Sequence, residues 1–334
     1  MTPKIIDIAR SANVSPATVS RVLRGYPHVS NDKRNRVLQV LKELNYVPNK
    51  VAQGLKSKKT GVIGHILPRT FPQPFFASVS LGVDQEAYGN DYRVLTLFSD
   101  SDAKREAQHV MDLGSRMVDG IVFTGVVSAK NVERAIELGI PVVMVERAKN
   151  VQGVDKVVVD DVQGAYSAVQ HMVMHNHRDI GFIGPHPSFD SVEFQRYHGF
   201  EKALLDHNLN VQSRFIKYVE DYPHTFGYQA MKELLASGCL PTALLVTSDW
   251  LAMGVLQALY EARVRIPDDI SVVSYDNSYG GLLSPPLSAV ASPMIDLGRS
   301  AVRLVLQRGE QSHAASKTVT INTSFVDRAS VRDI

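Results

Sequence analysis

The 334-residue sequence predicts a small all-α head of the helix-turn-helix type followed by two α/β lobes, each a parallel sheet covered by helices on both faces. Three observations predict this fold class. Residues 4–46 space their apolar side chains at helical intervals, with helix caps between them. After residue 60, continuous apolar runs alternate with amphipathic segments, and this alternation occurs in two series. The basic residues, finally, are concentrated at the N-terminal end.

The head is expected to contain three short helices. Ser15 is a good N-cap for the second helix, with Pro16 at the first helical position, where its missing N–H costs nothing. Ser30 is placed to cap the third helix. Apolar stripes support all three helices: Ile5, Ile8, Ala9 and Ala12 in the first, Val19, Val22 and Leu23 in the second, and Val37, Leu38, Leu41 and Leu44 in the third.

The segment 48–59 is basic and poor in large apolar residues. Pro48 could start a helix, but a helix of about eight residues is too short to be stable alone, and Gly54 weakens it further. We expect a linker that becomes helical only against a partner.

The rest of the chain contains two βα series. The first has strands expected at 61–67, 93–98, 119–125 and 141–146, with helices near 76–90, 103–116 and 130–138. The second has strands expected at 179–184, 215–219, 243–248 and 270–275, with helices near 162–175, 193–207, 225–237 and 250–263. Because ligands of open α/β sheets bind at the carboxyl ends of the strands, we expect a pocket in the cleft between the two lobes.

Charge is distributed unevenly along the chain. Residues 1–59 carry twelve Lys/Arg and three Asp/Glu, a net charge of +9, whereas the other 275 residues carry 24 basic and 31 acidic side chains, a net charge of −7. A basic head on an acidic body indicates a polyanion as partner, and the alternative is an ordinary solvated basic surface. Cys239 is the single cysteine, so no internal disulfide is possible. With no secretory signal pattern and no apolar run of membrane-spanning length, we expect a cytoplasmic protein that does not enter a membrane.

The order of several motifs resembles the LacI/GalR family of bacterial transcription regulators over nearly the whole chain. These motifs include IIDIARSANVSPATVSRVL, LNYVPNKVAQGL, VDGIVFTG, GIPVVMVER, HRDIGFIGP, RYHGF, PTALLVTSDWLAMGVLQAL and IPDDISVVSYDN. The resemblance implies a DNA-binding head, a hinge and a two-lobed sensor like the periplasmic binding proteins. It also implies a homodimer, with tetramers in some members. We therefore expect a helix-turn-helix domain at 1–47, a hinge at 48–59 and an effector-binding and dimerisation domain at 60–334. Within the sensor, the N-lobe is expected at about 60–160 and 292–318, and the C-lobe at about 161–291 and 319–334.

The resemblance places the second helix of the head in the major groove of an operator. Pro16, Ala17 and Arg21 match base-reading positions, and an arginine there can bind guanine O6 and N7 together. Phosphate contacts are implied for Ser15, Thr18, Ser20, Ser30 and Lys33, with Arg24 and His28 as further groove or backbone contacts. In the hinge, Leu55 matches a leucine that wedges between base pairs of the minor groove, flanked by Asn49, Ala52 and Lys56. The alternatives are a helix-turn-helix used only for packing, and a Leu55 that begins the sensor core.

The resemblance also assigns a site for a small effector. Arg196 and Asp276 match its polar contacts and Tyr222 an aromatic that stacks on a ring. The remaining positions are Phe75, Phe76, Glu146, Arg147, Asp160, Ser248 and Ser292. Arg196 and Asp276 could instead form a structural ion pair, and the phenylalanines could be core residues. A sugar or sugar derivative is the expected effector, with an anionic derivative as a hypothesis if Arg69, Arg147 and Arg196 converge.

The function expected is that of a sequence-specific regulator, with repression relieved by an inducer favoured over corepression. It would bind a pseudo-palindromic operator as a dimer and require no cofactor. A free solute-binding protein is the alternative, which the basic head and the missing signal peptide disfavour. An enzyme is not expected, because no catalytic motif is present. His171, His175 and His177 have a spacing that invites comparison with a metal site, but no acidic or cysteine ligand accompanies them in the sequence, so no metal is expected.

Overall fold

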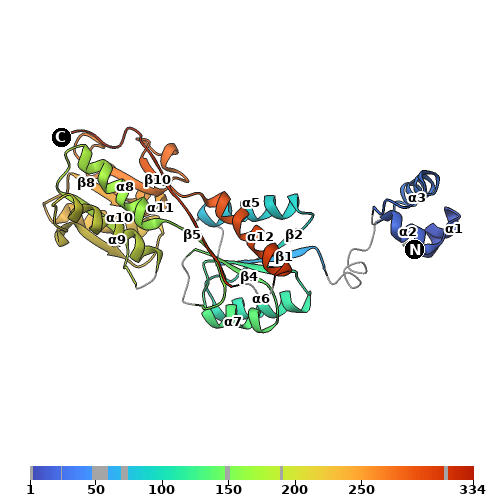
Figure 1. Ribbon diagram of the computed structural model, residues 1–334. Helices are drawn as coiled ribbons and strands as arrows, with labels where there is room; N and C mark the ends of the chain where they lie inside the picture. Colours follow the sequence, from blue (N-terminus) through green and yellow to red (C-terminus); the bar gives the residue numbers. More distant parts are fainter. Residues whose placement is uncertain are drawn as a thin grey trace. The chain divides into compact units, whose positions relative to one another are not determined.

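The chain forms two compact units that divide between Thr60 and Gly61, as seen in a computed structural model (Figure 1). The structure describes residues 3–23, 25–46, 59–68, 74–146, 151–188, 191–311 and 315–334. No helix among these residues has both the length and the apolar character needed to cross a membrane.

The first unit contains the three expected helices: α1 (Ile5–Ser11), α2 (Pro16–Leu23) and α3 (Asn31–Glu43). Ser15 caps α2, because its hydroxyl accepts a hydrogen bond from the Thr18 N–H at 3.2 Å. Ser30 stands directly before α3, but its side chain makes no capping hydrogen bond. The turn between α1 and α2 contains Asn13 at a φ of 52°, a left-handed conformation that asparagine tolerates.

The three helices share one small hydrophobic core. Its buried residues come from all three helices and their connections: Ile8, Ala9, Ala12, Val19, Val22, Val29, Val37 and Val40. The expected stripe of α3 was partly wrong. Leu38 and Leu44 are 50% and 38% exposed, and Val40 lies in the core instead. Val37 and Val40 are three residues apart and so share a face, whereas Leu38 is turned about 100° from Val37.

The second unit has two lobes, each with its own six-stranded sheet. The N-lobe sheet has the order β11-β5-β4-β3-β1-β2, and all of its pairs are parallel. Its strands are β1 (Val62–Leu67), β2 (Arg93–Phe98), β3 (Gly120–Thr124), β4 (Val142–Val145), β5 (Asp155–Val159) and β11 (Thr318–Ile321). One face is covered by α5 (Pro74–Gly89) and α12 (Met294–Glu310), the other by α6 (Ala103–Ser115) and α7 (Ala129–Glu137) (Figure 1).

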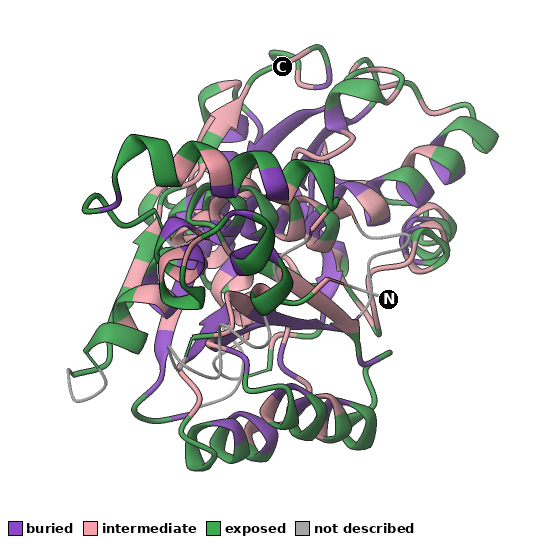
Figure 2. Ribbon diagram, turned by 90° about the vertical axis from the view of Figure 1, so that its right-hand side faces the viewer, coloured by how far each residue is buried: buried purple, intermediate pink, exposed green. Residues whose placement is uncertain are grey.

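The C-lobe sheet has the order β12-β10-β9-β8-β6-β7, in which only β12 runs antiparallel to its neighbour. Its strands are β6 (Ile180–Pro185), β7 (Ile216–Val219), β8 (Ala243–Val246), β9 (Ser271–Asp276), β10 (Ser288–Ala291) and β12 (Ser324–Val326). The covering helices are α8 (Asp161–Met174) and α9 (Val192–Asp206) on one face, and α10 (His224–Ala236) and α11 (Asp249–Glu261) on the other. Figure 2 shows that helices of the chain alternate between buried and exposed residues along their length.

The chain passes between the lobes three times. The first two passages follow β5 and β10, and the third lies between β11 and β12. The third passage was expected after about residue 318. The structure places it three residues later, because Thr318–Ile321 pair with Lys156–Val159 in the N-lobe sheet. The predicted fold class, two covered parallel sheets behind a helix-turn-helix head, is confirmed.

Candidate functional site: a helix-turn-helix surface and an arginine cluster

The α2 helix of the head has a buried face and an exposed face. Val19 and Val22 are buried, while Pro16, Ala17 and Arg21 are exposed. Among the remaining proposed DNA contacts, Ser15, His28, Ser30 and Lys33 are exposed, and Thr18 and Ser20 are half-buried. This separation of buried and exposed faces leaves the proposed base-reading side chains accessible to a partner.

The loop after α2 is held by α3. Nη2 of Arg34 donates a hydrogen bond to the Tyr26 carbonyl oxygen at 2.5 Å, next to the exposed His28. Arg36 pairs with Asp32 on α3 at 3.3 Å. Arg21 and Lys33, by contrast, form no ion pair with the described part of the chain. The other proposed DNA contacts, Arg24, Asn49, Ala52, Leu55 and Lys56, lie outside the described residues.

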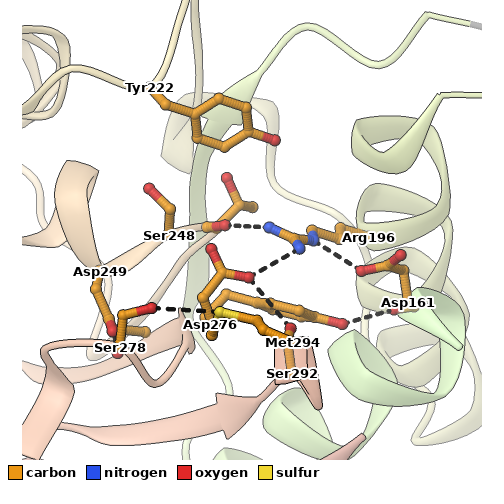
Figure 3. Close-up of polar contacts among 12 residues, drawn as sticks. Asp161, Arg196, Tyr222, Ser248, Asp249, Asp276, Ser278, Ser292 and Met294 are labelled. Atoms are coloured by element: carbon orange, nitrogen blue, oxygen red, sulfur yellow. Dashed lines mark hydrogen bonds and ion pairs between the residues drawn. The ribbon is translucent and has the colours of Figure 1, made fainter. Parts of the chain in front are cut away.

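In the C-lobe, Arg196 is the centre of a buried polar cluster, called here the Arg196 cluster and made of Asp161, Arg196, Thr247, Tyr275, Asp276 and Ser292 (Figure 3). All three guanidinium nitrogens donate to the chain. Nε donates to Asp161 at 2.9 Å, Nη1 to the Thr247 carbonyl oxygen at 2.6 Å and Nη2 to Asp276 at 3.1 Å. The guanidinium also lies over the Tyr275 ring, 3.8 Å from its centroid. The ion pair that the sequence left open as an alternative is therefore present.

The fold brings these groups together at the carboxyl ends of strands. Asp276 is the last residue of β9, and Thr247 follows β8. Asp161 begins α8 directly after the first passage between the lobes, and Ser292 follows β10 and donates its hydroxyl hydrogen bond to Asp276 at 3.2 Å. Two of the three lobe passages therefore supply a residue of the cluster.

The loop after Asp276 is fixed by a second buried carboxylate, Asp249. It accepts hydrogen bonds from the Ser274 hydroxyl at 2.5 Å, the Tyr279 N–H at 2.7 Å and the Gly280 N–H at 3.1 Å. Burial raises the pKa of Asp249, and these hydrogen bonds oppose the rise. Asp249 thus holds the end of β9, and with it Asp276, in position.

The N-lobe contributes Glu146, which follows β4. Its backbone has a φ of 69°, unusual for a glutamate, and Asp276 also has a positive φ, of 83°. Burial raises the pKa of Glu146 to about 8, opposed by Arg196 and reinforced by Asp161, Asp276 and Glu193. These four groups all belong to the C-lobe, so Glu146 lies within electrostatic reach of the other lobe. Strained backbone of this kind is found preferentially at functional sites.

Tyr222 and Glu193 complete this region. The Tyr222 hydroxyl donates a hydrogen bond to Glu193 Oε1 at 2.8 Å, and burial together with Glu193 raises the pKa of Tyr222 well above its usual value. Arg196 acts electrostatically on Tyr222, and Figure 3 shows the Tyr222 ring above Ser248 and the Arg196 cluster.

The remaining proposed effector contacts have structural roles that are visible in the fold. Asp160 caps α8 by accepting from the Gln163 N–H at 3.0 Å, and Ser248 caps α11 by accepting from the Leu251 N–H at 3.1 Å. Phe75 belongs to the N-lobe core, the alternative that the sequence left open, while Phe76 is half-buried and packs on it edge to face. Arg147 lies outside the described residues.

Sequence reasoning missed five residues of this region: Asp161, Glu193, Thr247, Asp249 and Tyr275. Asp161 and Tyr275 adjoin predicted residues, in the pairs DD and YD, so their position was a usable signal. Thr247 acts through its backbone carbonyl, which no sequence pattern reveals. Among the described residues no group of three His, Cys, Asp or Glu side chains is arranged to hold a metal ion.

Comparison with known proteins agrees with this architecture. Residues 4–49 match the domain described as bacterial regulatory proteins, lacI family, and residues 169–331 match a periplasmic binding protein-like domain. Catabolite control protein A of Priestia megaterium is 33% identical over 308 residues, which cover 91% of this chain and 92% of that protein. The chain belongs to the LacI family of bacterial regulatory proteins.

Further relatives support the assignment over the full length. The ribose operon repressor of Haemophilus influenzae is 33% identical to this LacI-family protein over 327 residues, 97% of each chain. A lac repressor dimer bound to operator and the anti-inducer ONPF superimposes with a TM-score of 0.87 at 25% identity, covering 99% of this chain and 100% of that chain. The transcriptional regulator CelR in complex with cellobiose superimposes with a TM-score of 0.75 at 26% identity, covering 98% and 99%. The named relatives are a catabolite control protein, an operon repressor and a transcriptional regulator, and the LacI resemblance is confirmed.

Proposed function

We propose that this protein is a transcriptional repressor that binds a pseudo-palindromic operator as a homodimer and is released by a sugar-like effector bound between its two lobes. The observation that carries the proposal is the Arg196 cluster. It includes one residue from each of two lobe passages, Asp161 and Ser292, and lies at the strand ends, where open α/β sheets bind ligands.

The DNA part of the proposal rests on α2. Its exposed face carries Pro16, Ala17 and Arg21 over a packed core, as a recognition helix requires. Arg21 is proposed to read one guanine in each half-site, and Ser15, Thr18, Ser20, Ser30 and Lys33 to fix the register on phosphates. Leu55 is proposed to open the minor groove at the centre of the operator. A repressor of this kind would act in the cytoplasm.

The effector part rests on Arg196, Asp276, Glu146 and Tyr222, with Ser292 holding Asp276. Carboxylates and a guanidinium beside an aromatic ring suit a hydroxyl-rich ring ligand. The lac repressor structure contains the anti-inducer ONPF and the CelR structure contains cellobiose, and we transfer this class of effector to the present chain. Binding that draws the lobes together changes the strand-end contacts of Ser292, which precedes α12.

The proposal is tested by selecting duplexes from a random library with the full-length protein at physiological salt. We expect a dyad-symmetric sequence whose binding weakens steeply with salt, because phosphate contacts release counterions. Sugars are then screened for a thermal shift and for release of that duplex. A protein that binds a sugar but selects no duplex would be a solute-binding protein, the competing function.

A further inference from the structure

The loop that follows Asp276 is held by an arginine from the C-terminal end of the chain. Arg328 lies two residues after β12, and its backbone N–H donates a hydrogen bond of 2.8 Å to the hydroxyl of Ser288, the first residue of β10. Its guanidinium reaches both ends of the loop between β9 and β10. Nη2 donates to Asn277 Oδ1 at 2.7 Å, and Nη1 donates to the Leu287 carbonyl oxygen. Arg328 therefore ties the beginning of this loop to its end.

The middle of the loop lies against the same guanidinium. A Cβ atom on Gly281 would be 3.3 Å from Nη2 and 3.4 Å from Cζ of Arg328, so a glycine here lets the backbone approach the arginine closely. Asp249 of α11 holds the N–H groups of Tyr279 and Gly280 in the same loop. The loop is thus fixed by two charged side chains that come from different parts of the C-lobe.

The loop follows directly on two residues with an unusual backbone conformation. Asp276 and Asn277 have φ values of 83° and 56°, and positive φ is uncommon outside glycine, although aspartate and asparagine tolerate it better than most residues. Backbone of this kind persists where the surrounding structure holds it in place. Arg328 supplies such a restraint at Asn277, next to the Asp276 carboxylate that accepts hydrogen bonds from Arg196 and Ser292.

Arg328 also connects the third lobe passage to this turn. The third passage leads from β11 into β12, which pairs with β10 and is followed by Arg328. The first passage reaches Asp276 through Asp161 and Arg196, and the second reaches it through Ser292. All three passages therefore lead, through hydrogen-bonded side chains, to Asp276 or to its neighbour in the chain.

We propose that Arg328 is a positioning residue of the effector site, which holds the turn at Asp276 and Asn277 and thereby places the Asp276 carboxylate for the hydroxyl groups of the effector. This inference rests on the proposed function, since it assigns a role at the site described above. The competing explanation is that Arg328 only stabilises the C-lobe. In that case its removal would lower the free energy of unfolding and leave the affinity for the effector unchanged.

The test compares Arg328→Met with Arg332→Met in the full-length protein. Arg332 lies four residues later, is exposed, and bonds to Ser271 and His177 through its backbone atoms, so this control removes the same charge from the same segment. Hydrogen exchange followed by mass spectrometry should be about tenfold faster or more over residues 277–287 in Arg328→Met, because the loop loses a charge-assisted hydrogen bond at each end. The Arg332→Met protein should exchange like the wild type.

Calorimetric titration then measures the effect on the site itself. Ribose, glucose, galactose and cellobiose are titrated into the wild-type protein to find the sugar that binds, and the variants are titrated with that sugar at a temperature at which each is folded. Arg328→Met should bind it about tenfold more weakly, and Arg332→Met as tightly as the wild type.

Asn277 gives access to the same hydrogen bond from its other side, and keeps the test decisive if Arg328→Met does not fold. Asn277→Asp retains both the acceptor oxygen and the tolerance of positive φ, and should keep the sugar affinity within about twofold of the wild type. Asn277→Ala loses both and should bind about tenfold more weakly. In the double variant with Arg328→Met, the loss should be smaller than the product of the two single losses, because both substitutions remove the same hydrogen bond.

Three results would count against the inference. Faster exchange of the loop together with unchanged sugar affinity would make Arg328 a purely structural residue, and the proposed function would still stand. Unchanged exchange in Arg328→Met would show that the loop does not depend on this arginine, and would also overturn the inference. If the wild-type protein binds none of the four sugars, the sugar effector of the proposed function is wrong, and this inference fails with it.

Discussion

Replacing Arg196 by methionine should destabilise the C-lobe strongly. The side chain is 5% exposed, and its partners Asp161 and Asp276 are 4% and 13% exposed. Methionine keeps much of the volume but removes the guanidinium that donates to two carboxylates and to the Thr247 carbonyl oxygen. Breaking a buried ion pair from one side costs about 3–5 kcal/mol, so the free energy of unfolding should fall by that amount. A domain of this size should then melt roughly 10 °C lower.

The variant should also change the pH dependence of stability. Burial already raises the pKa of Asp161 in the presence of Arg196, and loss of the guanidinium raises it further. An acid whose pKa is higher in the folded than in the unfolded protein lowers the free energy of unfolding at high pH, where the acid is ionised. This destabilisation disappears as the pH falls and the folded protein takes up the proton. The difference between variant and wild type should therefore be larger at pH 7 than at pH 5.

Urea unfolding followed by tryptophan fluorescence measures the free energy of unfolding of the C-lobe directly. Trp250 is the single tryptophan and lies in α11 of the same lobe, so it reports on this lobe alone. Arg214→Met, at an exposed position of the C-lobe, is the matched control and should change the unfolding free energy by less than about 0.5 kcal/mol. If Arg196→Met were as mild as Arg214→Met, the reasoning that buried carboxylates depend on Arg196 would be refuted.

Four further predictions follow from other parts of the chain. Arg21→Ala should relax selectivity at one base pair per half-site by about 1–3 kcal/mol in competition binding, and unchanged selectivity there would contradict its role. Leu55→Ala should weaken operator binding severalfold without changing effector affinity in calorimetry, and a parallel loss of effector affinity would exclude the wedge. Glu106 is buried and accepts hydrogen bonds from the Val127 and Ser128 N–H groups of the loop before α7, at 2.8 and 3.0 Å. Glu106→Ala should therefore lower the free energy of unfolding by about 1–3 kcal/mol in urea melts. An unchanged free energy of unfolding would show that the loop does not depend on Glu106. Burial lowers the pKa of His65 to about 3, so below pH 6.5 only the unfolded chain takes up a proton at this residue. The free energy of unfolding should therefore fall by up to about 1.4 kcal/mol per pH unit as the pH decreases. His65→Asn should flatten this slope between pH 6.5 and 5, and an unchanged slope would assign the loss to other groups.

The fold was predictable because its elements depend on local pattern. Helical spacing and the Ser15 cap defined the head, and the apolar runs of β1, β3, β6 and β8 are buried on both faces as a covered parallel sheet requires. The stripe of α3 was less well predicted, because leucine satisfies an apolar pattern whether or not it is buried. The last lobe passage was displaced because the pairing of β11 depends on β5, which is distant in sequence.

The candidate site was predictable where a side chain acts by its own chemistry. Arg196, Asp276 and Ser292 were all identified from the sequence, and hydrogen bonds join Asp276 to both of the others. Thr247 was missed because it contributes a backbone oxygen, and Asp249 because its role depends on a loop that the fold brings back to it. The effect of the C-lobe charges on the pKa of Glu146 was equally out of reach, since it exists only when both lobes are folded.

The central claim is that effector occupancy and operator affinity are coupled in one molecule. The most direct test measures operator affinity with and without a saturating amount of the sugar found by thermal shift, and the affinity for that sugar with and without operator. We predict the same factor in both directions, about 5- to 150-fold, with each ligand weakening the other. Operator affinity that does not change when the sugar is bound would contradict the account.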